Sequence, residues 1–108
     1  MIEVNQYVRE NGSCPFAAWF DSLDAQVAAK VRVALIRMEQ GNLGDSKPVG
    51  EGVWERRLHF AGGYRVYYGR DGAELVVLFV GGTKRRQQSD IAFARELWTE
   101  YRRRKKGG

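Results

Sequence analysis

The chain has 108 residues, 18 of them basic and 13 acidic, which gives a formal net charge of +5 at pH 7. This length predicts one domain, residues 1–108, whose hydrophobic core needs no disulfide or metal. The single cysteine, Cys14, excludes an internal disulfide, and the lack of an apolar run of about 18 residues excludes an ordinary membrane helix. Because no signal peptide is recognisable at the N-terminus, we expect a cytoplasmic protein that does not associate with membranes.

The positive charge is concentrated in the second half of the chain. Residues 1–52 hold 5 basic and 7 acidic residues, a net charge of −2, whereas residues 53–108 hold 13 basic and 6 acidic residues, a net charge of +7. This asymmetry indicates a polyanionic partner, most simply a nucleic acid. The alternative is a basic domain whose charge serves only solubility.

The first half of the chain predicts one strand and two helices. Residues 2–9 (IEVNQYVR) alternate loosely between apolar and polar side chains, which favours a strand at or near a sheet edge. Pro15 opens a short helix with an apolar stripe, and Asp24 is a suitable N-cap for a second helix that ends at Gly41. The two helices form a predicted hairpin, and residues 41–52 (GNLGDSKPVGEG) a connecting loop.

The second half predicts three strands and a final helix. The strands are Val53–Phe60, Tyr64–Arg70 and Glu74–Val80. The pair Asp71-Gly72 is a strong hairpin signal between the last two strands. Ser89 or Asp90 is expected to cap the final helix, and its basic end, residues 102–108, is expected to be frayed and solvated.

Together these elements predict an α+β fold with the order β-α-α-β-β-β-α. A mostly antiparallel sheet is expected to pack against an N-terminal helical hairpin and a C-terminal helix. The strand Glu74–Val80 is apolar on both faces, so we expect it to be the most central strand.

Strand alternation places a set of polar side chains on one face of the sheet. If the strands before and after Gly62-Gly63 pair as a hairpin, that face carries Glu55, Arg57, His59, Arg65 and Tyr67. The segment GGTKRRQQSD then leaves the neighbouring strand and adds Lys84, with Gly81-Gly82 as the exit. The predicted surface is basic and aromatic and carries one imidazole.

Each of these residues also has a purely structural interpretation. The two arginines can pair across the strands with Glu55, Tyr67 can simply cover the sheet, and the run from Lys84 to Arg86 can be a solvated turn. The register points Arg56 into the apolar face, so we expect its guanidinium to reach an edge or a bulge to change the register.

Two long segments resemble the RelE/ParE toxin superfamily, in particular its HigB-like branch of addiction-module killer proteins. They are GDSKPVGEGVWERRLHFAGGYRVYYGRDG and VVLFVGGTKRRQQSDIAFARELW. The most specific pieces are K-P-V-G-x-G-V-W-E, G-Y-R-V-Y-Y and G-G-x-K-x-x-Q-x-x-D-I. The resemblance covers nearly the whole chain and implies the RelE-like fold.

The resemblance also implies a function. It implies the toxin of a type II toxin–antitoxin system, an endoribonuclease (mRNA interferase) that cuts mRNA on the ribosome and stops translation. The implied partners are ribosome-bound mRNA and a cognate, HigA-like antitoxin with a helix-turn-helix domain.

Carried over by position, three basic residues match the family pattern. Arg57 and Arg65 fall on basic strand positions, and Lys84 falls on the basic residue that follows the apolar strand. Two positions depart from the family pattern. Glu55 stands where RelE has a lysine, and Asp90 stands near the position at which RelE has a catalytic tyrosine.

The candidate residues fall into two sets. The candidate catalytic residues are Arg57, His59, Arg65, Lys84 and Asp90. The candidate RNA-contacting residues are Glu55, Tyr67, Arg85 and Arg86.

These residue types suit RNA cleavage by the 2′-hydroxyl without a metal or cofactor. Guanidinium and ammonium groups neutralise charge on the phosphorane, and His59 or Glu55 can act as the base, since the ordinary pKa of histidine is about 6.5. Tyr67 can stack on a base or donate a proton. No cluster of His, Cys or acidic residues has the spacing of a metal site.

Two other functions are compatible with the sequence. One is a ParE-like inhibitor of DNA gyrase, which needs no cleavage residues on the same fold. The other is a non-catalytic toxin homologue that only binds its antitoxin.

Overall fold

The computed structural model describes residues 1–107, which form one five-stranded sheet and three α-helices. The elements are β1 (Glu3–Gln6), α1 (Pro15–Asp21), α2 (Ala25–Glu39), β2 (Ser46–Pro48), β3 (Val53–Leu58), β4 (Tyr64–Arg70), β5 (Leu75–Thr83), the 3₁₀ turn η1 (Lys84–Arg86) and α3 (Gln87–Gly107). The strand order is β1-β5-β4-β3-β2, and every neighbouring pair is antiparallel except β1 with β5. The predicted α+β class and mostly antiparallel sheet are therefore confirmed, and the arrangement is consistent with the RelE-like fold.

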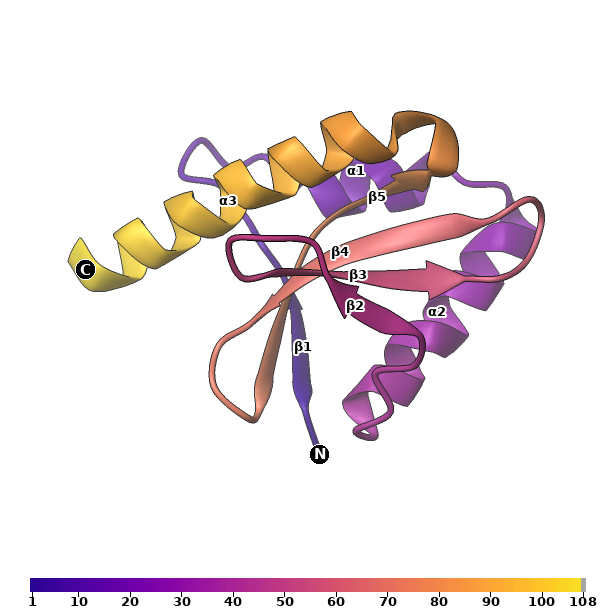
Figure 1. The fold of residues 1–108 in the computed structure, drawn as a ribbon, viewed down its shortest axis with the longest axis horizontal. Helices are drawn as coiled ribbons and strands as arrows, with labels where there is room; N and C mark the ends of the chain where they lie inside the picture. Colours follow the sequence, from indigo (N-terminus) through magenta and orange to yellow (C-terminus); the bar gives the residue numbers. More distant parts are fainter. Residues whose placement is uncertain (108) are drawn as a thin grey trace.

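The helices cover both faces of the sheet (Figure 1). One core lies between the sheet and the α1–α2 hairpin and includes Phe16, Val31 and Leu78, while the other lies under α3 and includes Phe79 and Leu97. From Val76 to Phe79, successive residues of β5 thus enter opposite cores, which explains the continuous apolar run. The middle strand is nevertheless β4, so the prediction that the strand from Glu74 would be most central is wrong.

Several local signals act as the sequence indicates. The Asp24 carboxylate accepts a 3.0 Å hydrogen bond from the amide of Val27 at the start of α2, and Pro15 is the first residue of α1. The turn at Asp71-Gly72 joins β4 to β5. In the segment predicted as a loop, however, Ser46–Pro48 pairs with Trp54–Arg56 and forms the edge strand β2.

The glycine pair Gly81-Gly82 lies within β5, which corrects the prediction that the strand ends at Val80. A methyl group on Gly81 would lie 2.4 Å from the ring of Trp19, and one on Gly82 would lie 2.0 Å from Oδ2 of Asp90. The glycines therefore allow a helix from each layer to approach the strand closely.

Helix α3 begins at Gln87, directly after η1, two residues before Ser89 and three before Asp90, the two predicted caps. Asp90 consequently lies inside the first turn and is buried. At the other end the helix continues to Gly107, in contrast to the frayed end that the sequence suggested, while residue 108 lies outside the described residues. Arg104 donates to the hydroxyl of Tyr7 at 3.1 Å, and Lys105 pairs with Asp71 at 2.6 Å, so these contacts hold the basic segment in place.

Candidate functional site

The candidate residues gather at the end of the sheet where β3 and β5 finish. Leu58 of β3 and Thr83 of β5 both pair with Tyr64 of β4, so His59 and Lys84 are the first residues beyond the same row. Arg57 and Arg65 form the adjacent cross-strand pair. Since neighbouring strands are about 4.8 Å apart, the backbones that carry His59 and Lys84 are separated by about 10 Å. We call Arg57, His59, Arg65 and Lys84 the strand-end site.

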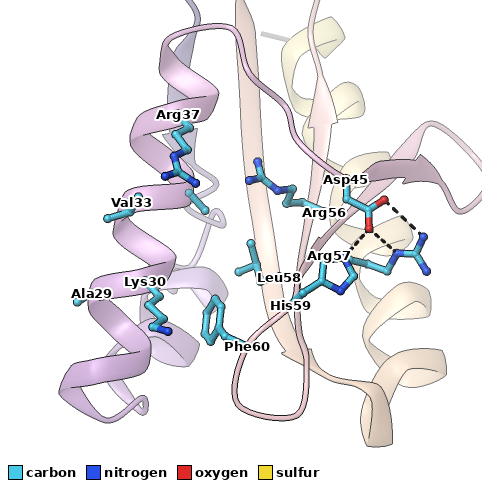
Figure 2. A pocket seen from close by; sticks show the side chains of 11 residues that line it. Ala29, Lys30, Val33, Arg37, Asp45, Arg56, Arg57, Leu58, His59 and Phe60 are labelled. Atoms are coloured by element: carbon cyan, nitrogen blue, oxygen red, sulfur yellow. Dashed lines mark hydrogen bonds and ion pairs between the residues drawn. The ribbon is translucent and has the colours of Figure 1, made fainter.

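Asp45, immediately before β2, holds two members of the strand-end site (Figure 2). Its Oδ2 lies 2.7 Å from Nε2 of His59 and 3.3 Å from Nε of Arg57. The hydrogen bond from His59, together with the nearby Arg57, lowers the pKa of the Asp45 carboxyl. An ionised Asp45 accepts a hydrogen bond from the N–H at Nε2, and in the tautomer that carries this N–H the unprotonated Nδ1 of His59 is an acceptor.

His59 is the most accessible acid–base candidate at this site. Its side chain is 71% exposed, whereas Glu55 is 0% and Asp90 7% exposed. The imidazole is thus both oriented by a carboxylate and open to a ligand. This is the arrangement that a general base requires.

Glu55 and Tyr67 are fully buried beneath the start of α3. Oε2 of Glu55 accepts hydrogen bonds from the Tyr67 hydroxyl at 3.0 Å and from the side-chain amide of Gln87 at 2.9 Å. Arg65 lies 3.5 Å from the same oxygen, and Lys47 lies 3.9 Å from Oε1. These five residues form the Glu55 network.

The burial of the Glu55 network corrects one part of the sequence prediction. The sequence predicts that Glu55 and Tyr67 contact RNA, but each is 0% exposed, so neither side chain is accessible to RNA in this conformation. Burial, and then the neighbouring Glu55 carboxylate, raise the pKa of the Tyr67 hydroxyl far above neutrality. The structural role of this network is to fix the side chain of Arg65 at the edge of the site.

Asp90 is a buried carboxyl that lies against the backbone of Gly82. Its Oδ2 has no hydrogen-bond partner among residues 1–107. Burial raises the pKa of Asp90, while the positive charge of Arg86 opposes the increase. A carboxyl of this kind holds its proton more readily than an exposed aspartate does.

The basic run after β5 forms the turn η1 and projects into solvent. Lys84, Arg85 and Arg86 are all exposed, and none of them makes an ion pair with an acidic side chain of residues 1–107. Their charge is therefore available to an anionic ligand at the same end of the sheet.

Three polar residues of the site were not identified from the sequence, namely Asp45, Lys47 and Gln87. Asp45 and Lys47 adjoin or belong to β2, which the Gly- and Pro-containing composition of the segment concealed. The pairing of β2 with β3 brings both beside the predicted basic residues. The segment carries no alternation of apolar and polar side chains, because Asp45, Ser46 and Lys47 are consecutive polar residues.

Two further observations concern residues 1–107 as a whole. Within residues 1–107, no three His, Cys, Asp or Glu side chains lie close enough together to hold a metal ion. No helix of the same residues is long and apolar enough to cross a membrane.

Comparison with known proteins identifies a family and a relative. The model of a family described as phage derived protein Gp49-like (DUF891) matches residues 18–99, a span that includes Asp45, the Glu55 network, the strand-end site and Asp90. An uncharacterized protein of Haemophilus influenzae (strain ATCC 51907 / DSM 11121 / KW20 / Rd) is 37% identical over 86 residues, which are 79% of this chain and 87% of the relative.

Proposed function

The chain belongs to the phage-derived Gp49-like family, which is associated with toxin–antitoxin systems, and we propose that it is a toxin that cleaves ribosome-bound mRNA. In this proposal it is a metal-independent endoribonuclease of the RelE/ParE type that inhibits translation. Its cellular partners are mRNA on the ribosome and a cognate antitoxin.

The observation that carries the proposal is the carboxylate-oriented His59 at the same end of the sheet as the exposed Lys84. Asp45 holds Nε2 of His59 at 2.7 Å and leaves Nδ1 as an acceptor, while Lys84 follows the same row of the sheet two strands away. A base beside a cationic surface is what attack by a 2′-hydroxyl on its own phosphate needs. A protein that only blocks gyrase has no use for an oriented base.

In the proposed reaction each group has one role. Nδ1 of His59 removes the proton from the 2′-hydroxyl, whose oxygen then attacks the phosphorus and forms a cyclic phosphate. Lys84, Arg57 and Arg65 stabilise the negative charge on the phosphorane. The 5′-oxygen leaves with a proton from solvent water, because Asp90, the donor candidate from the sequence, is only 7% exposed and lies against the backbone of Gly82.

The remaining basic residues serve binding rather than chemistry. Arg85 and Arg86 are exposed on η1 and are proposed to contact the RNA backbone or the ribosome. Such contacts depend on salt concentration, because binding releases counterions from the phosphates.

Induction of the protein in bacterial cells tests this function against its main alternative. We expect incorporation of labelled amino acid to stop within minutes and primer extension to reveal new 5′ ends within translated messages. Arg65→Ala and Lys84→Ala should each abolish growth inhibition while the purified variants keep the circular dichroism spectrum of the wild type.

Other outcomes of the same experiment would contradict the proposal. Full toxicity from both folded variants would show that the strand-end site is not the active site. Continued translation together with induction of the DNA-damage response would instead identify a gyrase inhibitor.

A further inference from the structure

A cleft of about 460 Å³ lies between α2 and β3 (Figure 2). Val33 from α2 and Leu58 and Phe60 from the β3 side give it an apolar lining. Lys30, Arg37 and Arg56 add positive charge to the same walls. Val33 is 46% exposed although it is a large aliphatic side chain, so this surface is apolar and basic at once.

Arg56 is the unusual residue of the cleft. Its backbone pairs with Val66 in regular register, and its side chain is only 7% exposed, so neither the predicted bulge at Arg56 nor the predicted escape to an edge occurs. A methyl group on Gly44, which has a φ of +63°, would lie 2.2 Å from Cζ of Arg56. The loop before β2 therefore closes directly over the guanidinium and holds it in place.

The buried guanidinium of Arg56 has no anionic partner of its own. Its Nε and Nη1 make no hydrogen bond with any of residues 1–107. Burial lowers the pKa of Arg56; nearby Tyr68 and the charge of Asp45 oppose this decrease, and the positive charge of Arg37 adds to it. Figure 2 shows Arg56 extending from β3 toward α2, the helix that carries Arg37.

The one acidic side chain of this cleft is already engaged elsewhere. Asp45 accepts from His59 and contacts Arg57, and it makes no ion pair with Arg56. A buried charge without a partner is costly, so the cleft is complementary to a carboxylate or another anionic group from outside the described chain.

We propose that this cleft binds a short acidic segment of a partner protein, with a carboxylate between Arg37 and Arg56 and an apolar side chain over Val33 and Leu58. The apolar lining of the cleft suits a protein side chain better than it suits a sugar–phosphate backbone. The exposed cations of η1 suit a sugar–phosphate backbone better. The identification of this partner as the antitoxin rests on the proposed function.

This position of the segment has a consequence for activity. Arg57 and His59 also line the cleft, so an occupant covers one side of the strand-end site. The bound segment would therefore inhibit cleavage by blocking access to His59, without a change in the fold.

Selection from a library of random dodecapeptides displayed on phage tests the cleft directly. We expect the purified protein to enrich peptides in which Asp or Glu stands close to a large apolar residue. A labelled synthetic peptide of the enriched sequence should bind Arg37→Glu and Val33→Asp at least tenfold more weakly than the wild type. Arg103→Glu, an exposed residue of α3 with the same charge change, should bind within twofold of the wild type.

Three results would overturn the cleft assignment. The first is that selection does not enrich acidic peptides. The second is that Arg37→Glu and Arg103→Glu bind the peptide equally well. The third is that Arg37→Glu loses affinity for a single-stranded RNA dodecamer but keeps its affinity for the peptide. The third result would assign the cleft to RNA.

The cleavage assay separates failure of this inference from failure of the proposed function. Arg37→Glu should cleave ribosome-bound mRNA as fast as the wild type, and the selected peptide should inhibit the wild type but not this variant. If the wild type does not cleave mRNA but peptide binding still depends on Arg37, the cleft assignment stands and the proposed function fails. If cleavage is normal and peptide binding is independent of Arg37, the cleft assignment alone fails.

Discussion

The hydrogen bond between Tyr67 and Glu55 offers a quantitative test of the buried network. Tyr67→Phe removes the donor of a 3.0 Å hydrogen bond to a carboxylate while it leaves the ring in place, and both residues are fully buried. Hydrogen bonds to charged groups contribute about 1.5–3 kcal/mol to stability. Because Gln87 and Arg65 remain beside the same oxygen, we expect a loss near the lower limit, about 1.5–2 kcal/mol.

Tyr68→Phe is the matched control for this substitution. Tyr68 is the next residue and is equally buried; the Ser46 hydroxyl near it donates to the carbonyl of Leu43 at 2.7 Å, and the Tyr68 hydroxyl makes no hydrogen bond of normal geometry within residues 1–107. Removal of this hydroxyl should change the free energy of unfolding by less than about 0.5 kcal/mol or increase it, because no hydrogen bond is lost.

Urea unfolding followed by tryptophan fluorescence measures the free energy of unfolding of both variants. In thermal unfolding, the loss expected for Tyr67→Phe corresponds to a fall in Tm of roughly 6–16 °C for a domain of this size. Equal stability of the two variants would refute the stabilising role of the Glu55 network. Since Tyr67 is buried, the folded Tyr67→Phe protein should also cleave mRNA within a few-fold of the wild-type rate, and complete loss of cleavage would show that Tyr67 reaches the substrate.

Three further results are expected. Gly82→Ala should lower the free energy of unfolding by about 1–3 kcal/mol in urea titration, because its methyl group would lie 2.0 Å from Oδ2 of Asp90; wild-type stability would contradict this. The free energy of unfolding of Asp90→Asn should exceed that of the wild type at pH 7, because burial disfavours the ionised carboxyl of Asp90. This difference should shrink as the pH falls through the raised pKa of Asp90 toward about 3.9. A difference independent of pH would show that ionisation of Asp90 is not its cause. Cleavage in a system that does not itself require magnesium should persist in EDTA, and its loss would indicate a metal-dependent reaction.

The sequence predicts the face of the sheet on which the site residues lie because strand alternation has a fixed period of two. The hairpin between β3 and β4 pairs Glu55 with Tyr67 and Arg57 with Arg65, as the alternation and the turn at Gly62-Gly63 imply. These pairs depend only on local geometry and on one short connection.

The sequence does not predict how deeply these residues are buried. The start of α3 at Gln87 covers Glu55, and that start follows from the extension of β5 through Gly81-Gly82. Glycines have no side chain to signal a strand, so the apolar pattern ends at Val80 although the hydrogen-bonded ladder continues. Trp19 packs closely against Gly81 and Asp90 against Gly82. These are tertiary contacts that no local sequence pattern indicates.

Arg56 illustrates a second limit of sequence reasoning. An arginine at an inward-facing strand position suggests a register change or a side chain that reaches water. The structure instead keeps the register and closes Gly44 over the guanidinium. Only the packing of the loop before β2 against α2 and β3 reveals that the charge is retained inside, which is why the cleft was not apparent from the sequence.

Cleavage of ribosome-bound mRNA by Lys84→Ala tests the central proposal most directly. Lys84 is exposed and makes no ion pair within residues 1–107, so its replacement leaves the fold intact and removes only a charge at the strand-end site. We predict that the wild type cleaves the message and that Lys84→Ala cleaves it roughly a hundredfold or more slowly, as expected when one transition-state donor is lost. Lys106→Ala, at the far end of α3, should cleave at the wild-type rate. Equal rates for the two lysine variants, or no cleavage by the wild type, would contradict the assignment of this protein as an endoribonuclease that acts through the strand-end site.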